Sequence, residues 1–180
     1  MTSAFLDFPN DRTEFSDAGY SALGRALTYA TAFETICRSL SCIQHVKSRL
    51  TKLQKAAPKG TDVFPIAVGE IWNLRMRQHI KKILDYQEWR FTSDVAGSLA
   101  KAREARNEIA HQTALGLPST IETDAGRSEF LARIAVLTEE ISVGFMIVEL
   151  TSLMETQEMI PTVEFLAQYS QRIVRWVTEM

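Results

Sequence analysis

Apolar residues recur at steps of three and four along most of this chain, the spacing that places them on one face of an α-helix. The first such stretch predicts a long helix that starts at Ser16 or Asp17, both good capping residues, and runs to about residue 55. Pro58-Lys59-Gly60 ends it. The apolar positions of this helix are Leu23, Leu27, Ala30, Phe33, Cys37 and Leu40. Residues 1–15 lack this period, so we expect an irregular lead-in there.

Four further helices are expected after the first. Ser93 and Thr162 are residue types that cap helix starts, and Pro65 suits a first helical turn. The expected ranges are about Pro65–Tyr86, Ser93–Thr113, Arg127–Glu155 and Thr162–Val177. No β-hairpin motif and no alternating apolar run stands out between them. Residues 16–180 are therefore predicted to form a single all-α domain, a helical bundle of about five helices.

Composition narrows the class of protein. With 46% hydrophobic residues the 180-residue chain can bury one substantial core. No apolar run approaches the roughly 18 residues that span a bilayer, and the acidic N-terminal residues do not resemble a secretion signal. We therefore expect a cytoplasmic protein without a membrane partner. Cys37 and Cys42, five positions apart on one helix, are expected to stay reduced because they point to different faces.

Motifs for metals and cofactors are missing from the sequence. No cluster of cysteine and histidine has the spacing of metal ligands. There is no glycine-rich phosphate loop and nothing similar to G-x-S-x-G. We therefore expect neither a metal nor a cofactor.

Basic residues concentrate in the middle of the chain although the net charge is only −2. From Thr35 to Arg106 there are 14 Lys and Arg against 6 Asp and Glu, a balance of +8. Between Glu34 and Asp62 there is no acid at all. Two interpretations stay open: folding gathers these charges into a positive surface beside a site, or it distributes them over ordinary solvated helix faces.

The segment from Arg103 to His111 is the strongest candidate for chemistry. Asn107 and His111 are four residues apart, so they share one face of the expected third helix, and the long side chain of Arg106 can reach the same patch. Arginine binds phosphate through paired donors, and histidine can move a proton near neutral pH. This set suits phosphodiester chemistry without a metal. Arg103, one turn before Asn107, and Lys101 are expected to contact phosphate groups of the substrate.

The residues Arg106-Asn107-x-x-x-His111 resemble the R-x4-6-H motif of the HEPN superfamily, in which a polar residue usually follows the arginine. The opening of the first helix, Tyr20–Leu40 (YSALGRALTYATAFETICRSL), is also similar to bacterial HEPN-like proteins. The resemblance implies a HEPN-like helical fold and a ribonuclease that is a toxin or phage-defence effector. It further implies a homodimer whose two Arg106-Asn107-His111 sets line one cleft, RNA as substrate, a cyclic 2′,3′-phosphate product, no metal, and an antitoxin as a possible protein partner.

Two other interpretations stay open. In one, the protein is a catalytically silent helical module that binds a nucleotide, RNA or a protein, as in HEPN-like regulators or proteins similar to the mannitol repressor. In the other, Arg106 pairs with an acid of a neighbouring helix and His111 is only a helix cap. His45 and His79 have no partner pattern and are expected to be structural or exposed. Trp72, Trp89 and Trp176 can stack on bases, although helical spacing is more typical of core positions.

Overall fold

The structure is a computed structural model that describes residues 14–111 and 123–179. Helices hold 83% of the described residues, far above the usual third, and no strand occurs among them. The helices are α1 (Glu14–Ala56), α2 (Phe64–Trp72), α3 (Met76–Leu84), α4 (Ser93–His111), α6 (Asp124–Thr156) and α7 (Val163–Thr178). The predicted all-α bundle is confirmed. Residues 1–13 of the expected lead-in and the expected helix end at Thr113 lie outside the described residues. Helix α1 already begins at Glu14, so its predicted start at Ser16 or Asp17 was two to three residues too late.

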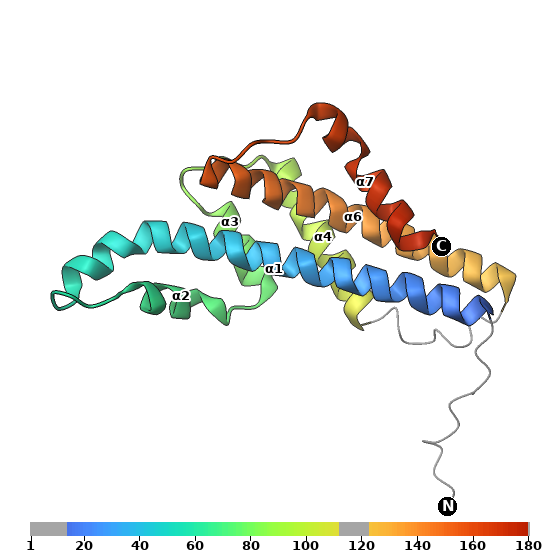
Figure 1. The fold of residues 1–180 in the computed structure, drawn as a ribbon, viewed down its shortest axis with the longest axis horizontal. Helices are drawn as coiled ribbons and strands as arrows, with labels where there is room; N and C mark the ends of the chain where they lie inside the picture. The colour runs from blue at the N-terminus through green and yellow to red at the C-terminus, as the bar shows by residue number, and fades with distance from the viewer. Residues whose placement is uncertain (1–13, 112–122, 180) are drawn as a thin grey trace, which may run out of the picture.

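Helix α1 runs the whole length of the molecule, and the other helices pack along it (Figure 1). Helix α6 lies beside α1 and runs in the same direction, since Tyr29 stacks on Phe145 and Lys47 reaches Glu155. Helix α7 returns antiparallel over the first half of α1, and α2 folds back under its second half. Helix α4 crosses between α1 and α6. Together these contacts place the two ends of α3 and the last turns of α4 against the middle of α1.

The core follows the apolar period that the sequence predicts. The expected positions of α1 are buried, with Leu27 only partly so, and they pack against apolar residues of α4 and α6. The buried ones are Leu99, Ala102, Ala105 and Ile109 of α4, and Phe130, Ile134, Leu137, Ile141 and Val148 of α6. Trp176 is a difference: it was expected to be in the core of the last helix, but it is 48% exposed while Val177 beside it is buried.

The expected second helix is two helices, and that part of the prediction was wrong. The chain leaves α2 at Asn73, and Arg75 is extended (φ −72°, ψ 152°) before α3 begins. The side chain of Gln78 accepts a hydrogen bond from the Arg75 backbone N–H (2.9 Å), which satisfies a donor at the new helix start. Apolar residues continue on both sides of the break, and no glycine or proline marks it. The break turns α3 against α1 and α4.

Threonine hydroxyls cap three of the helices. The Oγ1 atoms of Thr123 and Thr162 accept from Gly126 N–H (3.1 Å) and Phe165 N–H (3.3 Å), as expected for Thr162. At α4 the cap is Thr92, which accepts from Val95 N–H (3.4 Å), and not the expected Ser93. The cap therefore lies one residue earlier than predicted. None of the helices in the described ranges combines the length and the apolar character needed to cross a bilayer.

Helices α4 and α6 approach closely at Gly144. A Cβ atom at this position would overlap the Cβ of Ala102 and lie 3.1 Å from Cζ of Phe33. Two small residues therefore let the backbones of α4 and α6 approach on one side while Phe33 of α1 fills the space behind. This contact sets the depth at which α4 sits in the bundle, and so the position of its last two turns.

Candidate functional site

An open cleft of about 480 Å³ lies where the last turns of α4 meet the start of α3 and the middle of α1. Four residues of the predicted segment line it: Arg103, Arg106, Asn107 and His111. The i,i+4 spacing of the sequence therefore produces the predicted shared face. The opposite face of α4 is buried through Ala102, Ala105 and Ile109, which fixes the helix against the core.

Two arginines of α3 and one acid of α1 complete the cleft, and the sequence did not indicate them. They are Arg75, Arg77 and Glu34. The described residues of the lining thus carry four guanidinium groups, one carboxylate and one imidazole. Within the described ranges neither Arg75 nor Arg77 makes an ion pair. Their positive charge is available to an anion. Guanidinium groups bind phosphate well because they donate paired hydrogen bonds to its oxygens.

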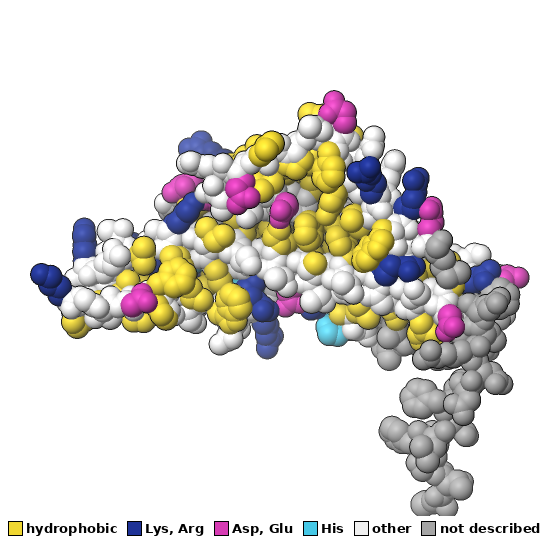
Figure 2. Space-filling view, viewed as in Figure 1, with side chains coloured by type: hydrophobic (Ala, Val, Ile, Leu, Met, Phe, Trp, Pro, Cys, Tyr) yellow, Lys and Arg dark blue, Asp and Glu magenta, His cyan; other side chains and the backbone are white. Residues whose placement is uncertain are grey.

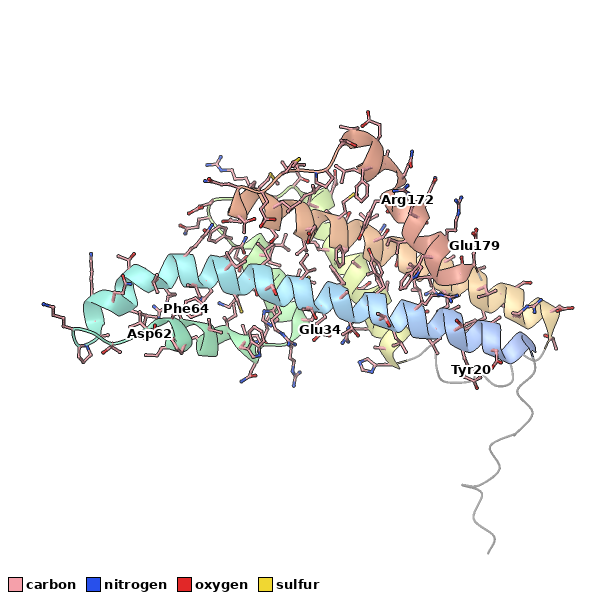
Figure 3. The ribbon with its side chains drawn as sticks, in the orientation of Figure 1. Tyr20, Glu34, Asp62, Phe64, Arg172 and Glu179 are labelled. Atoms are coloured by element: carbon pink, nitrogen blue, oxygen red, sulfur yellow. The ribbon has the colours of Figure 1, made fainter. Side chains whose placement is uncertain are left out.

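Figure 2 shows basic side chains, an acidic group and a histidine side by side at the lower edge of the molecule. Figure 3 places Glu34 on the same lower side of α1. Of the basic stretch, Arg75, Arg77, Arg103 and Arg106 gather at the cleft. Part of the basic stretch is used elsewhere, because Lys47 pairs with Glu155 (2.5 Å) and Arg49 with Glu70 (3.1 Å). Some charges of the basic stretch are thus gathered beside the cleft, and others lie on ordinary helix faces away from it.

Arg106 is held on both sides. Its Nη2 atom pairs with the carboxylate of Glu34, and its Nη1 atom donates to Oδ1 of Asn107 at 3.2 Å. The expected alternative, an acid on a neighbouring helix, is thus present, and that acid is Glu34. Because the guanidinium can only donate, Asn107 must turn its oxygen to Arg106, which leaves its NH₂ group for another acceptor.

Glu34 is shared between two arginines. Besides Arg106 it binds Arg38, one turn further along α1, at 3.3 Å. The side chains of Glu34 and Arg106 are 24% and 21% exposed, so their pair lies at the edge of solvent. An incoming phosphate would compete with this carboxylate for Arg106.

His111 is the last described residue of α4, and its side chain is exposed at the mouth of the cleft. Among the described residues it makes no hydrogen bond or ion pair. An exposed imidazole beside guanidinium groups is accessible to a substrate.

Lys101 lies apart from the other predicted residues. It lines a different surface depression, with Glu139 and Glu140 of α6 among its neighbours. Its position on α4, two residues before Arg103, turns it away from the cleft face. The neighbouring carboxylates repel a phosphate, so the structure does not bring Lys101 to the site.

The other two histidines are structural, within what the sequence predicted. His79 is fully buried, and its Nδ1 atom lies 2.7 Å from Oγ of Ser41, which ties α3 to α1. Burial lowers the pKa of His79 because the charged imidazole would lose its hydration. His45 binds Glu70 of α2 at 2.8 Å. Neither belongs to the cleft.

Both cysteines are free and buried in α1, as expected. Burial, and secondly the carboxylate of Glu34, raises the pKa of the Cys37 thiol. Burial also raises the pKa of Cys42, although Arg38 acts in the opposite direction. Thiols held in the protonated form are poor nucleophiles. Neither cysteine lines the cleft.

Comparisons of this chain with protein-family models, with curated proteins and with solved structures find no match. The likeness to the HEPN superfamily rests on the residues Tyr20–Leu40 and Arg106–His111 themselves and stays a prediction.

Proposed function

We propose that this protein is a metal-independent endoribonuclease of the HEPN type, with the role of a toxin or defence effector. The observation that carries the proposal is the arginine cleft, in which Arg106, Asn107 and His111 share one lining with Arg75, Arg77 and Arg103. Guanidinium groups supply charge to a phosphate, and the histidine supplies a proton carrier. Three other hollows on the described surface, beside His45, Glu139 and Lys101, do not contain this combination.

The proposed reaction is attack of a ribose 2′-OH on its own 3′-phosphate. The 2′ oxygen bonds to phosphorus, the bond from phosphorus to the 5′ oxygen breaks, and a cyclic 2′,3′-phosphate and a 5′-OH result. One group takes the 2′-OH proton and another protonates the departing 5′ oxygen, and His111 is suited to either task. Arg106 stabilises charge on the phosphoryl oxygens, and the NH₂ group of Asn107 donates to the same phosphate.

A single set of these residues provides one proton carrier where the reaction needs two. A homodimer with a two-fold axis near the end of α4 would supply a second His111 and a second Arg106. His111 is exposed at the cleft mouth, which is compatible with such an arrangement. The dimer is part of the proposal. An antitoxin that covers the cleft would be its natural inhibitor.

The ion pair of Arg106 with Glu34 favours a second candidate, a catalytically silent module that binds RNA or a nucleotide. In this alternative the carboxylate neutralises Arg106 permanently, and Arg75 and Arg77 remain as anion-binding groups. Arg103 also lines the cleft, but its Nη2 atom pairs with Glu104 at 3.1 Å. The two candidates differ in one observable, the breaking of a phosphodiester bond.

Cleavage of single-stranded RNA in the presence of a chelator is the test. The purified protein should produce fragments with cyclic 2′,3′-phosphate ends, and a 2′-deoxy substitution at the cleaved nucleotide should block the reaction. His111→Ala should reduce the rate by about 10²- to 10⁴-fold, the usual contribution of a general acid or base. Arg106→Ala should weaken both binding and rate, and Asn107→Ala should have a smaller effect.

Two controls accompany this test. His45→Ala removes a histidine that lies outside the cleft and should leave the rate unchanged. Thermal melting establishes that each variant is folded. Undiminished cleavage by folded His111→Ala would remove this residue from the mechanism, and binding without cleavage on any RNA would select the silent module.

A further inference from the structure

Trp72 is a large aromatic residue left half in solvent at the end of α2. A buried tryptophan here would have contributed to the hydrophobic core, but the side chain of Trp72 is 48% exposed. The guanidinium of Arg38 lies over its ring, 5.5 Å from the ring centroid. A cation at this distance orients an aromatic ring. The exposed remainder of the indole is therefore held in place and still open.

The ring is connected to the cleft through charged side chains. Arg38 lies over Trp72 and binds Glu34 at 3.3 Å, and Glu34 in turn binds Arg106. Along the backbone, Arg75 of the cleft follows Trp72 by only three residues. Figure 2 shows hydrophobic side chains over α2 directly beside the basic group at the lower edge, and Figure 3 shows Phe64 and Glu34 on the same side of α1.

An exposed, orientated aromatic ring beside a positive cleft fits one class of ligand in particular. A single-stranded nucleic acid offers a phosphate for the arginines and, on the adjoining nucleotide, an unstacked base for the ring. In a duplex the bases are stacked inside and paired, so no base face is available. An acidic peptide would use the arginines but would leave the indole without a partner.

We propose that Trp72 is a stacking platform for an unpaired base of an RNA strand whose neighbouring phosphate lies in the arginine cleft. The inference takes RNA as the ligand from the proposed function, but it does not depend on catalysis. It attributes the preference for single-stranded over double-stranded RNA to the indole of Trp72. The arginines supply the affinity that any polyanion shares, and Trp72 supplies the part that depends on an accessible base.

The test is binding of a short single-stranded RNA with 2′-O-methyl riboses, which lacks the attacking hydroxyl and cannot be cleaved by the proposed reaction. Trp72→Ala should weaken this binding by roughly 5- to 150-fold, the effect of losing one stacked base. Trp72→Phe should keep most of the affinity, and Trp72→Leu should not. Binding of the same sequence as a duplex should be weaker from the start and insensitive to all three changes.

Trp176→Ala is the matched control, because Trp176 is also 48% exposed but lies on α7. It should bind the single strand like the unmodified protein. Wild-type affinity in folded Trp72→Ala, or equal losses for single strand and duplex, would overturn the inference. So would restoration of binding by Trp72→Leu, which would indicate a simple apolar contact.

The outcomes also separate this inference from the proposed nuclease. Binding that depends on Trp72 without any cleavage of natural RNA would retain the platform and remove the ribonuclease. If Trp72→Ala cleaves RNA as well as the unmodified protein and binds the 2′-O-methyl strand equally tightly, the ribonuclease would be retained and the stacking platform rejected. Failure of the protein to bind any single strand would overturn both.

Discussion

Arg106 of α4 forms an ion pair with Glu34 of α1, so the arginine best placed to bind a phosphate in the cleft already has an anionic partner. The pair is only partly buried, and pairs at the edge of solvent contribute little to stability. Its larger effect is on the cleft, because it lowers the positive charge there and orients Arg106 toward Asn107. If the cleft binds RNA as proposed, Glu34 competes with the substrate phosphate for Arg106.

Glu34→Gln should therefore tighten RNA binding. The amide keeps the shape of the side chain but removes the charge that competes for Arg106. We expect affinity for single-stranded RNA to rise several-fold at low salt, and the dependence of log affinity on log salt to steepen by about one phosphate contact. Titration of a labelled strand at several salt concentrations measures both.

Glu108→Gln is the matched control for this prediction. Glu108 is also an acid that pairs with an arginine, Arg133 of α6 (2.5 Å), but it does not line the cleft. The same loss of one negative charge should leave the salt dependence nearly unchanged. Equal effects of the two substitutions would mean that Glu34 acts only through net charge.

How far the sequence predicts this site depends on where its residues lie in the chain. The spacing within Arg103–His111 is local, and a helix turns it into one face whatever the rest of the fold does. Arg75, Arg77 and Glu34 come from other helices, and only the packing of α3 and α4 on α1 brings them to the cleft. A periodic pattern along one helix contains no information on that packing.

The divided second helix shows the same limit. Its apolar period continues across Asn73 and Arg75 without glycine or proline, so the pattern predicts one helix. Tertiary contacts break the helix instead, because Trp72 packs against Arg38 while His79 contacts Ser41. The glutamine three residues after Arg75 was the one local signal of a new helix start.

Gly144→Ala should destabilise the protein, although alanine is the better helix former. The new methyl group would overlap Cβ of Ala102 and press on Phe33, so α4 and α6 must separate. Overpacking of this kind costs about 1–3 kcal/mol, which should lower the melting temperature by several degrees. Because α4 carries the cleft, RNA binding should weaken as well.

Gly97→Ala on α4 provides the comparison, since nothing lies within 4 Å of a Cβ there. This change should raise stability by about 0.4–1 kcal/mol. The double variant Gly144→Ala with Ala102→Gly should recover part of the loss by restoring room between the helices. A Gly144→Ala protein that melts like the unmodified one would contradict a close approach of α4 and α6 at this position.

Stability should fall as the pH is lowered through the range where histidine titrates. Burial lowers the pKa of His79 in the folded protein below its ordinary value of about 6.5. As the pH falls, the imidazole therefore binds a proton in the unfolded chain before it does so in the folded protein. The contribution of neutral His79 to the free energy of unfolding is complete only above about pH 6.5. That contribution is lost between this pH and the lower pKa of the folded state.

His79→Asn isolates this effect, because asparagine is uncharged at every pH and can still bond Ser41. It should be less stable at pH 7.5, but its free energy of unfolding should depend less steeply on pH between 7 and 5. Denaturant unfolding at each pH provides the values. Parallel pH profiles for the two proteins would assign the acid sensitivity to other groups.

Activity in mixed dimers distinguishes a composite site from two independent sites. If each cut needs His111 from both protomers, a dimer with one His111→Ala chain is inactive. After equal amounts of unmodified and His111→Ala protein exchange subunits, about a quarter of the dimers retain both histidines, so about a quarter of the full activity should remain. Independent sites would leave about half of the full activity.

Arg172→Ala, an exposed change on α7 (Figure 3), is the control and should leave the activity of the mixture undiminished. Sedimentation under the same conditions establishes the dimer, and an active monomer would contradict the composite site.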